Sequence, residues 1–433
     1  DMKQLAQMLI YEYSQQAVAR GGQAIFSDIN LYWEIPDHFI DVPAIGPGGK
    51  ETGKKYVEYQ ETAQRFARAL FEVYLEGDGV GRPFFFPKPL LHITNRFFQT
   101  PGHEQFLELV GLVAAEKGNP YFVFDRDNTA RISECCRLSF KLEASDIDDA
   151  KTPWKMRFSA LQNVTLNLPR VAYKSEHDDS KLFQNLEHLM NLTVRAHMEK
   201  RRFIETLLSY GQNGPLALLT MNLDGEPYLR LHRVTHLVGL LGLNEMVQYH
   251  TGKQLHESDD AFKFGLKVVS FLKILCDRKA KETGLRFVLE QTPAESTAYR
   301  LARLDYEHFP SQSTEVLKGT IPDRTYYTNS TYLNISEQLS PIERVKKEGV
   351  FHPLIEAGAL THIWLGESKP DSKALSNFVV KVFQNTKNAQ IAFSPEFTSC
   401  LDCGRIYRGI SKECPWCSAV DNGVIKINAQ KIG

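Results

Sequence analysis

The sequence predicts an α/β fold with a largely parallel core, and three observations favour it. Short apolar runs of strand type recur along the chain, and they alternate with longer segments whose apolar residues follow helical spacing. Such alternation is typical of strands joined by helical crossovers. The length of 433 residues suits a large α/β barrel with a small appendage, and no internal repeat or low-complexity tract suggests another architecture.

In the first part of the chain, the residue pattern predicts helices and buried strands in turn. The 58–76 segment places Phe66, Leu70, Val73 and Tyr74 on one face, as an amphipathic helix requires. The other expected elements are helices over 1–19 and 104–116 and strands within 20–33, 81–94 and 121–124. Residues 125–145 are polar and lack a helical period, so we expect an irregular segment there.

The same pattern continues to residue 395. We expect helices over 181–210, 259–282, 340–348 and 371–386, and another beginning after residue 291. Strands are expected over 163–169, 286–290, 326–333, 361–366 and 389–395, and 235–250 reads as a strand leading into a helix.

Composition and charge exclude several classes of protein. The formal net charge is −1, so the chain does not have the basic excess of a nucleic-acid-binding protein. No uninterrupted apolar run is long enough to cross a membrane, and no secretory signal opens the sequence. The chain begins inside a helical pattern without an initiator Met, so we expect a fragment of a longer protein. Free cysteines without a secretory signal predict a reducing, cytoplasmic location.

Four of the seven cysteines form two C-x2-C pairs near the C-terminus. Cys400 and Cys403 make the first pair, and Cys414 and Cys417 the second. Two such pairs can supply four thiolates to one tetrahedral metal, and we predict a structural zinc rather than two disulfides. We therefore expect a zinc module over 396–433 that follows an α/β domain over 1–395.

The other three cysteines differ in their surroundings. Cys276 lies in an apolar helical run and is expected to be a buried small side chain. Cys135 and Cys136 are adjacent in the polar 125–145 segment. A loop on a rigid scaffold can present a reactive thiol, although two inert loop cysteines would look the same in the sequence.

Polar residues also follow or interrupt several strands. Alternation in 163–169 would place Thr165 and Asn167 on one face and Leu166 on the other, either lining a site or lying on an exposed edge. Thr292 is placed as the N-cap of a helix with Pro293 first, and Glu295, Ser296 and Thr297 would complete an anion site or simply cap the helix. Asn329 and Ser330 lie in a second such loop. His92, His232 and His362 show no ligand spacing and are expected to be packed or exposed.

Nine short motifs, taken together and in order, resemble the anaerobic (class III) ribonucleoside-triphosphate reductases, which are glycyl radical enzymes. They run through nearly the whole chain: RGGQAIFSDIN, GRPFFFPKPLLHIT, CCRLSF, NVTLNLPRVAY, VGLLGLNEM, QTPAESTAYRLARLD, YYTNSTYL, HIWLGE and FSPEFTSCLDCG with CPWC. The resemblance implies a ten-stranded α/β barrel of two five-stranded halves with a central finger loop. It also implies that this chain is the large, catalytic subunit.

The resemblance also assigns roles to residues of this chain. Cys136, directly before an Arg, matches the thiyl-radical cysteine, with Cys135 as the lesser candidate. Asn167 matches an amide that faces the ribose, and the four cysteines match zinc ligands. Gly433 stands where the family has its radical glycine, although the usual following Tyr is absent, so the glycine is either Gly433 or the next residue. Thr292, Glu295, Ser296, Thr297, Asn329 and Ser330 are the candidates for binding the triphosphate.

The resemblance further implies cofactors and partners. The glycyl radical would be generated by an activase that uses S-adenosylmethionine and an iron–sulfur cluster. Ribonucleoside triphosphates would be the substrates, formate or a thioredoxin-like dithiol the reductant, and ATP or deoxynucleotides the effectors of a homodimer. Two other functions remain as alternatives: a pyruvate formate-lyase-like enzyme, whose group lacks the four-cysteine cluster, and a zinc-ribbon nucleic-acid-binding protein, which the charge disfavours.

Overall fold

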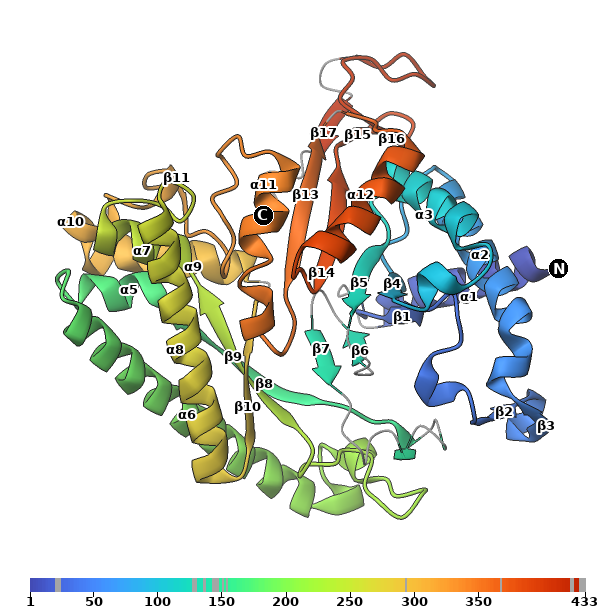
Figure 1. The fold of residues 1–433 in the computed structure, drawn as a ribbon, viewed down its shortest axis with the longest axis horizontal. Coiled ribbons are helices and arrows are strands. Elements are labelled where there is room, and N and C mark those ends of the chain that lie inside the picture. Colours follow the sequence, from blue (N-terminus) through green and yellow to red (C-terminus); the bar gives the residue numbers. More distant parts are fainter. Residues whose placement is uncertain are drawn as a thin grey trace. The chain divides into compact units, whose positions relative to one another are not determined.

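The computed structural model describes residues 1–19, 25–126, 131–134, 138–141, 148–149, 152, 155–292, 294–366, 368–420 and 424–427 (Figure 1). Its contacts divide the chain into two compact units. Unit 1 comprises Asp1–Thr152, Ser340–Gly349 and Leu360–Gly433, and unit 2 comprises Pro153–Leu339 and Val350–Ala359. The division into a catalytic domain over 1–395 and a zinc module over 396–433 stays a prediction.

Unit 1 is built on a five-stranded sheet with the order β1-β4-β5-β14-β13. β1 pairs with β4 and β4 with β5 in parallel, β13 pairs with β14 in parallel, and β5 and β14 are antiparallel neighbours. Two parallel sets of strands therefore meet at one antiparallel junction. The strands are β1 (Asp28–Leu31), β4 (Lys88–Thr94), β5 (Tyr121–Asp125), β13 (Leu360–Gly366) and β14 (Gln390–Pro395).

Helices pack on one face of this sheet and form the core of unit 1. Buried side chains of α1, α2, α3 and α12 meet those of every strand in one apolar cluster, which includes Phe71, Phe106, Phe122, Ile363 and Phe393. The helices are α1 (Met2–Ala19), α2 (Gln60–Glu76), α3 (His103–Lys117), α11 (Pro341–Glu348) and α12 (Ser372–Asn385). The alternate strand residues, Asn30, His92 and Asp125 among them, belong to the opposite face.

Three small sheets complete unit 1. β2 (Pro43–Ile45) pairs with β3 (Glu51–Lys55), and β6 (Arg131–Glu134) pairs with β7 (Leu138–Lys141) as an antiparallel hairpin. β15 (Phe397–Cys400), β16 (Ile406–Arg408) and β17 (Val424–Ile427) form a three-stranded antiparallel sheet around the C-x2-C pairs. The hairpin was not expected, although residues 138–141 alternate apolar and polar side chains; the irregular segment was inferred only from polarity and the lack of a helical period.

Unit 2 is built on a three-stranded parallel sheet with the order β10-β9-β8. Its strands are β8 (Ala160–Asn167), β9 (Thr235–Leu241) and β10 (Arg286–Glu290), and its long helices are α6 (Asp179–Ser209) and α8 (Asp259–Thr283). The remaining elements are α5 (Leu168–Tyr173), α7 (Leu243–Thr251), α9 (Glu295–His308), α10 (Pro310–Ser313), β11 (Lys318–Thr320) and β12 (Arg324–Tyr326).

The apolar face of the unit 2 sheet is covered by helices. Leu166, Val238 and Leu289 of the three strands pack against buried residues of α6 and α8. Cys276 of α8 lies in this core at 1% exposure, and burial raises the pKa of its thiol to about 12. The prediction that Cys276 is a buried small side chain is confirmed.

Helix ends follow the sequence signals in most places. Asp178, Ser258 and Asp371 accept a hydrogen bond from the backbone three residues later and so cap α6, α8 and α12. α8 ends at Gly284, whose φ of 70° most other residues would adopt only with strain, and β10 follows directly.

The α/β class is confirmed, and two expected strand boundaries were wrong. The strand expected over 163–169 ends at Asn167, because Pro169 and its neighbours begin α5. In place of a strand over 326–333, the chain forms β12 and then a single bridge between Asn329 and Leu241. Closure into a ten-stranded barrel stays a prediction. None of the described helices is long and apolar enough to cross a bilayer.

Candidate functional site

The second face of the unit 2 sheet carries a group of polar residues, called the polar face below. The register pairs Thr165 with Gly239 and Gly239 with Glu290, so these residues lie on one face of β8, β9 and β10. Asn163 and Asn167 lie two residues to either side of Thr165 and share that face. The predicted alternation in 163–167 is confirmed, since the intervening leucine faces the apolar core.

Gly239 leaves the space into which these polar groups converge. A Cβ atom at Gly239 would lie 1.9 Å from Thr292 Oγ1, 2.7 Å from Asn163 Oδ1 and 2.8 Å from Thr165 Oγ1. Asn163 Nδ2 donates to the Glu290 carboxylate and, at 3.2 Å, to Thr292 Oγ1. Asn163 Oδ1 is buried without a hydrogen-bond partner among the described residues. It therefore offers an acceptor to a hydroxyl or a water.

We expect Gly239→Ala to disturb this arrangement strongly. The added methyl overlaps Thr292 Oγ1 and must push apart side chains from β8 and the segment after β10, at a cost of about 1–3 kcal/mol in stability. Displacing polar groups by roughly 1 Å should also lower turnover by about a hundredfold if they contact a substrate. Stability is measured by thermal unfolding, and turnover is measured by steady-state kinetics.

Gly79→Ala is the matched control, because a Cβ atom there would meet nothing within 4 Å. If both variants behaved alike, the convergence over Gly239 would have no functional meaning.

Asn167 is held by a buried carboxylate. Its Oδ1 accepts from Arg170 N at 3.3 Å and so caps α5, while its Nδ2 donates to Asp305 at 2.9 Å. Asp305 has no exposed surface and also accepts from Arg170 Nε at 2.6 Å and from the Tyr327 hydroxyl at 2.9 Å. Arg170 balances the buried charge, so the Asn167 amide is fixed by a network of no net charge.

Two tyrosines extend this network. The Tyr173 and Tyr327 hydroxyls are 3.0 Å apart, and burial raises the pKa of each well above its ordinary value. Both phenols are therefore neutral at physiological pH and act as hydrogen-bond donors rather than as bases.

A cavity of ≈ 680 Å³ opens beside this polar face. Asn163, Thr165 and Asn167 of β8 line it, together with Thr297 of α9. Its other polar walls are basic or amide groups, namely Gln162, Arg170, Lys174, Asn185, His188 and Arg300. The cavity thus places neutral amides beside cationic groups, which suits a ligand with hydroxyls and an anionic end.

The structure separates the residues predicted at the start of α9. The predicted N-cap at Thr292 is wrong: α9 begins at Glu295, its N-cap is Ala294, and no side chain caps it. Thr292 instead lies 3.4 Å from the Glu290 carboxylate and within reach of Asn163. Glu295 and Ser296 are exposed. Of this group, Thr297 lines the cavity with Asn167.

The loop that carries Asn329 and Ser330 is bound to the start of α7. The carbonyls of Thr328 and Ser330 accept from Gly242 N and Leu243 N at 3.1 and 3.2 Å. Thr328 also donates through N and Oγ1 to Glu245, a buried residue whose pKa is raised by that burial. Ser330 adopts a φ of 47°, and its Oγ and Asn329 Oδ1 are buried without partners among the described residues. Neither residue lines the cavity.

The thiols and the glycine of the predicted radical site fall outside the described residues. The hairpin register pairs Glu134 with Leu138, so Cys135, Cys136 and Arg137 are the connection between β6 and β7. Gly433 also lies outside the described part of the chain.

Sequence reasoning did not identify Asp305 and Arg170. Asp305 shares the buried stripe of α9 with Ala298 and Ala302, at spacings of three and four residues. A carboxylate on an otherwise apolar stripe signals a buried partner, and that signal was available. Arg170 could not be recognised as the partner, because 135 residues separate the two in the chain.

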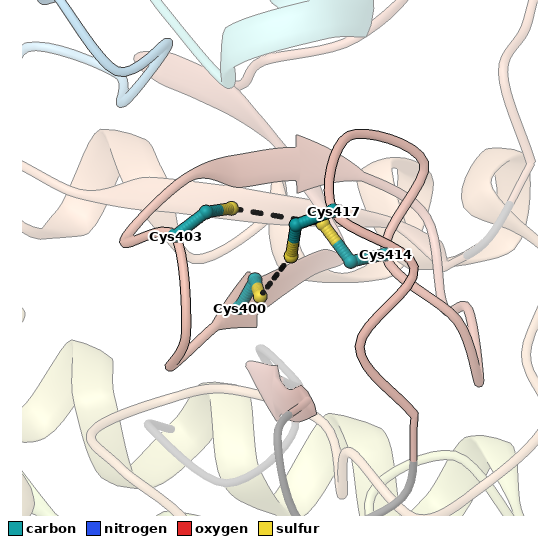
Figure 2. Close-up of side chains that lie close together, drawn as sticks. All are labelled: Cys400, Cys403, Cys414 and Cys417. Atoms are coloured by element: carbon teal, nitrogen blue, oxygen red, sulfur yellow. Dashed lines mark hydrogen bonds between the residues drawn. The ribbon is translucent and has the colours of Figure 1, made fainter.

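The four C-terminal cysteines come together as predicted (Figure 2). Their Sγ atoms all lie within 4.8 Å of one another, with Cys400 and Cys417 at 3.5 Å and Cys403 and Cys414 at 3.7 Å. Tetrahedral Zn²⁺ with Zn–S bonds of about 2.3 Å separates its sulfurs by about 3.8 Å, so the residues fit a four-thiolate zinc site.

Both C-x2-C pairs have the same local geometry. Gly404 N donates to Cys400 O at 3.0 Å, and Ser418 N donates to Cys414 O at 2.9 Å. Gly404 and Ser418 each adopt a positive φ, of 70° and 57°. Each tight turn therefore directs two thiols toward one point, which the spacing alone had indicated.

Arg408 fastens this module to the rest of unit 1. Its guanidinium donates to Ala115 O at 3.0 Å, to Gly366 O at 2.9 Å, to Glu396 O at 3.0 Å and also to Ser368 O. Arg82 adds a bond to Gly404 O at 3.2 Å. The module is thus anchored at the end of α3 and beyond β13 by backbone acceptors.

Comparison with protein families gives one match through nearly the whole chain. The family model described as anaerobic ribonucleoside-triphosphate reductase matches residues 1–428. Curated relatives include the anaerobic ribonucleoside-triphosphate reductases of Salmonella typhimurium and Escherichia coli, 24% and 23% identical over 62% of this chain. The chain spans 38% of the length of each of these relatives.

Solved structures of the same description share the fold. An anaerobic ribonucleotide reductase superposes with a TM-score of 0.73 at 19% identity, covering 97% of this chain and 61% of that one. The Thermotoga maritima enzyme, solved in complex with dATP and CTP, gives 0.72 at 19% identity over 97% and 64%. A glycyl radical enzyme from Archaeoglobus fulgidus is more distant, with a TM-score of 0.54 at 10% identity over 80% and 50%.

Proposed function

The chain belongs to the family of anaerobic ribonucleoside-triphosphate reductases, and we propose that the complete protein reduces ribonucleoside triphosphates to 2′-deoxyribonucleoside triphosphates for DNA synthesis. The observation that carries the proposal is the polar face of the unit 2 sheet. It holds a fixed, uncharged amide at Asn167 and an open acceptor at Asn163, beside a cavity with basic walls.

In the proposed reaction, a radical on a glycine Cα takes a hydrogen atom from the thiol of Cys136. The glycyl radical is stabilised by both flanking amides, and glycine has no side chain to hinder approach to its Cα. The Cys136 thiyl radical then abstracts the ribose 3′ hydrogen, and the 2′ hydroxyl leaves as water after protonation. Cys135 is the lesser candidate for this role, and Gly433 or the residue that follows carries the glycyl radical.

Asn167 is proposed to hydrogen-bond the ribose hydroxyls. A neutral amide can donate and accept without bringing charge to a carbon-centred radical. Asp305 and Arg170 support this role, since they fix the amide without leaving a net charge beside it.

The triphosphate is proposed to lie toward the start of α9 and the loop after β12. Thr292, Glu295, Ser296, Thr297, Asn329 and Ser330 are the candidate contacts, with Glu295 acting through its backbone N–H at the helix N-terminus. Thr297 has the strongest support, because it lines the cavity with Arg170 and Arg300.

We propose that Cys400, Cys403, Cys414 and Cys417 hold a structural zinc, whose contribution is to fold the module that leads to the radical glycine. The fold proposed for the complete protein is the ten-stranded barrel with the β6–β7 hairpin as its finger loop. The two parallel strand sets of unit 1, joined at an antiparallel junction, are what two barrel halves require.

The cofactors and partners proposed for the complete protein follow from the family. A radical activase that uses S-adenosylmethionine and an iron–sulfur cluster would form the glycyl radical. Formate or a thioredoxin-like dithiol would supply the reducing equivalents, ATP and deoxynucleotides would act as effectors, and the protein would be a cytoplasmic homodimer. The Thermotoga maritima structure described with dATP in the specificity site makes nucleotide regulation a reasonable extension to this chain.

The decisive experiment is an anaerobic assay of the complete protein after activation. A glycyl doublet in the EPR spectrum, followed by deoxynucleotide formation from a ribonucleoside triphosphate, is expected. Assays with formate and with a dithiol identify the reductant. A radical without deoxynucleotide products, together with formate release from pyruvate and CoA, would instead favour the lyase-like alternative.

A further inference from the structure

A buried chain of hydrogen bonds in unit 1 ends on β6, the hairpin strand that precedes Cys136. Asp125 Oδ2 lies 2.7 Å from His92 Nδ1, and His92 Nε2 lies 2.7 Å from Asn30 Oδ1. These residues come from the adjacent strands β5, β4 and β1 and share the face opposite the apolar core. His92 has no exposed surface, and Tyr32 stacks on its ring with centroids 4.3 Å apart.

Asn30 makes a two-point contact with the backbone of Ser133 in β6. Its Nδ2 donates to Ser133 O at 2.9 Å, and its Oδ1 accepts from Ser133 N at 3.1 Å. The side-chain amide thus satisfies both backbone groups of one residue, as a neighbouring strand would. Because both bonds are made, the orientation of the amide is fixed: oxygen toward Ser133 N and His92, nitrogen toward Ser133 O.

This orientation also fixes a proton on His92. Asn30 Oδ1 is an acceptor, so His92 Nε2 must be the donor in their 2.7 Å contact. Asp125 contacts the other ring nitrogen at 2.7 Å and holds the ring in place. The pair therefore keeps a donor pointed at Asn30, and Asn30 in turn holds the hairpin.

Ser133 stands three residues before Cys136, on the strand that leads directly into the Cys135–Cys136–Arg137 connection. In a hairpin of two four-residue strands, fixing Ser133 restrains β6 one residue before that strand ends. Hydrogen-atom transfer is steep in distance, and a misplacement of roughly 1 Å can cost about a hundredfold in rate.

We propose that Asn30 is a positioning residue for the reactive thiol, clamping the β6–β7 hairpin through the backbone of Ser133, with His92 and Asp125 as its support. The inference rests on the proposed function for the identity of the thiol. The clamp itself is a property of the described residues.

The first test measures the contact between Asn30 and Ser133 in the absence of any reaction. Hydrogen–deuterium exchange is measured by mass spectrometry on the unactivated, complete protein, with fragmentation that resolves the Ser133 amide. Asn30→Ala removes the acceptor of that amide and should speed its exchange by about tenfold or more. Asn30→Asp keeps an acceptor for Ser133 N and places a second oxygen against Ser133 O, so the Ser133 amide should retain more of its protection than in Asn30→Ala.

The second test measures the effect of this contact on turnover. In the activated protein, Asn30→Ala should lower kcat by about tenfold to a hundredfold while the glycyl radical yield and KM stay near wild type. His92→Gln should have a smaller effect of the same kind, and adding it to Asn30→Ala should cause little further loss, because His92 acts through Asn30.

Asn95→Ala is the matched control, since it removes an exposed amide that donates to Arg126 O at 3.1 Å beyond the end of β4. Unchanged Ser133 exchange in Asn30→Ala, or faster exchange with kcat like that of Asn95→Ala, overturns the proposal. Should the wild-type protein form no deoxynucleotide, the proposed function fails, and the exchange result still decides whether the clamp exists. If Asn30→Ala does not fold, Asn30→Leu, which keeps the side-chain volume and removes both polar groups, is measured in its place with the same expected results.

Discussion

The complete protein with Cys136→Ser is expected to accept a glycyl radical at the wild-type yield and to form no deoxynucleotide. A serine O–H bond is stronger than a cysteine S–H bond, so a glycyl radical cannot draw a hydrogen atom from the substituted residue. The loss should exceed about a thousandfold, or about 4 kcal/mol of transition-state stabilisation. EPR quantifies the radical, and a chromatographic assay quantifies the deoxynucleotide.

Cys135→Ser is the natural control, because it changes the neighbouring thiol by the same atom. We expect it to retain turnover within about tenfold of wild type. The reverse result, an inactive Cys135→Ser and an active Cys136→Ser, would move the thiyl assignment to Cys135. Near-normal turnover in both single variants and in the double variant would contradict a thiyl mechanism at this hairpin.

Replacing two cysteines of the cluster, as in Cys400→Ser with Cys403→Ser, is expected to abolish glycyl radical formation and leave the rest of the protein folded. Strands of three and four residues cannot hold β15, β16 and β17 together without a metal. Structural zinc contributes about 10–16 kcal/mol in small domains, more than this sheet could replace. Bound zinc should fall from about one per chain to near zero by mass spectrometry.

Cys276→Ala serves as the control, because it removes a thiol from the unit 2 core and leaves the cluster intact. It should keep its zinc and its radical while losing some thermal stability. A wild-type radical yield in the zinc-free double variant would show that the module does not support the radical site. A global loss of circular dichroism would show that the metal stabilises more than the module.

The sequence was most informative where a function depends on residues close together in the chain. The spacing of Cys400, Cys403, Cys414 and Cys417 was enough to predict one cluster, and the alternation around Asn167 was enough to predict a polar face. Both features are local, and neither depends on how distant segments meet.

Contacts between distant segments were not predictable in the same way. Asp305 and Arg170 look like ordinary helix residues until the fold brings them together, and Asn30 and Ser133 are 103 residues apart. His92 was expected to be packed or exposed, and the residues around it in the sequence did not indicate its two polar partners, Asp125 and Asn30. The Thr292 cap failed because its hydroxyl is directed to the Glu290 carboxylate and accepts from Asn163 Nδ2 with the oxygen that a cap would use.

The antiparallel junction between β5 and β14 determines from which side each reactive segment arrives. Two adjacent antiparallel strands run in opposite directions and finish at opposite ends of the sheet. The chain therefore leaves β5 toward the β6–β7 hairpin at one end, and it leaves β14 toward the cysteine module at the other end. Arg408 of the module donates to Ala115 O in the last turns of α3, the helix that leads into β5, and so anchors the module at that second end of the sheet. The two segments that the proposed reaction requires therefore leave the unit 1 sheet at opposite ends. For the proposed hydrogen-atom transfer, the chain beyond the cysteine module must therefore return along the length of the sheet to reach Cys136.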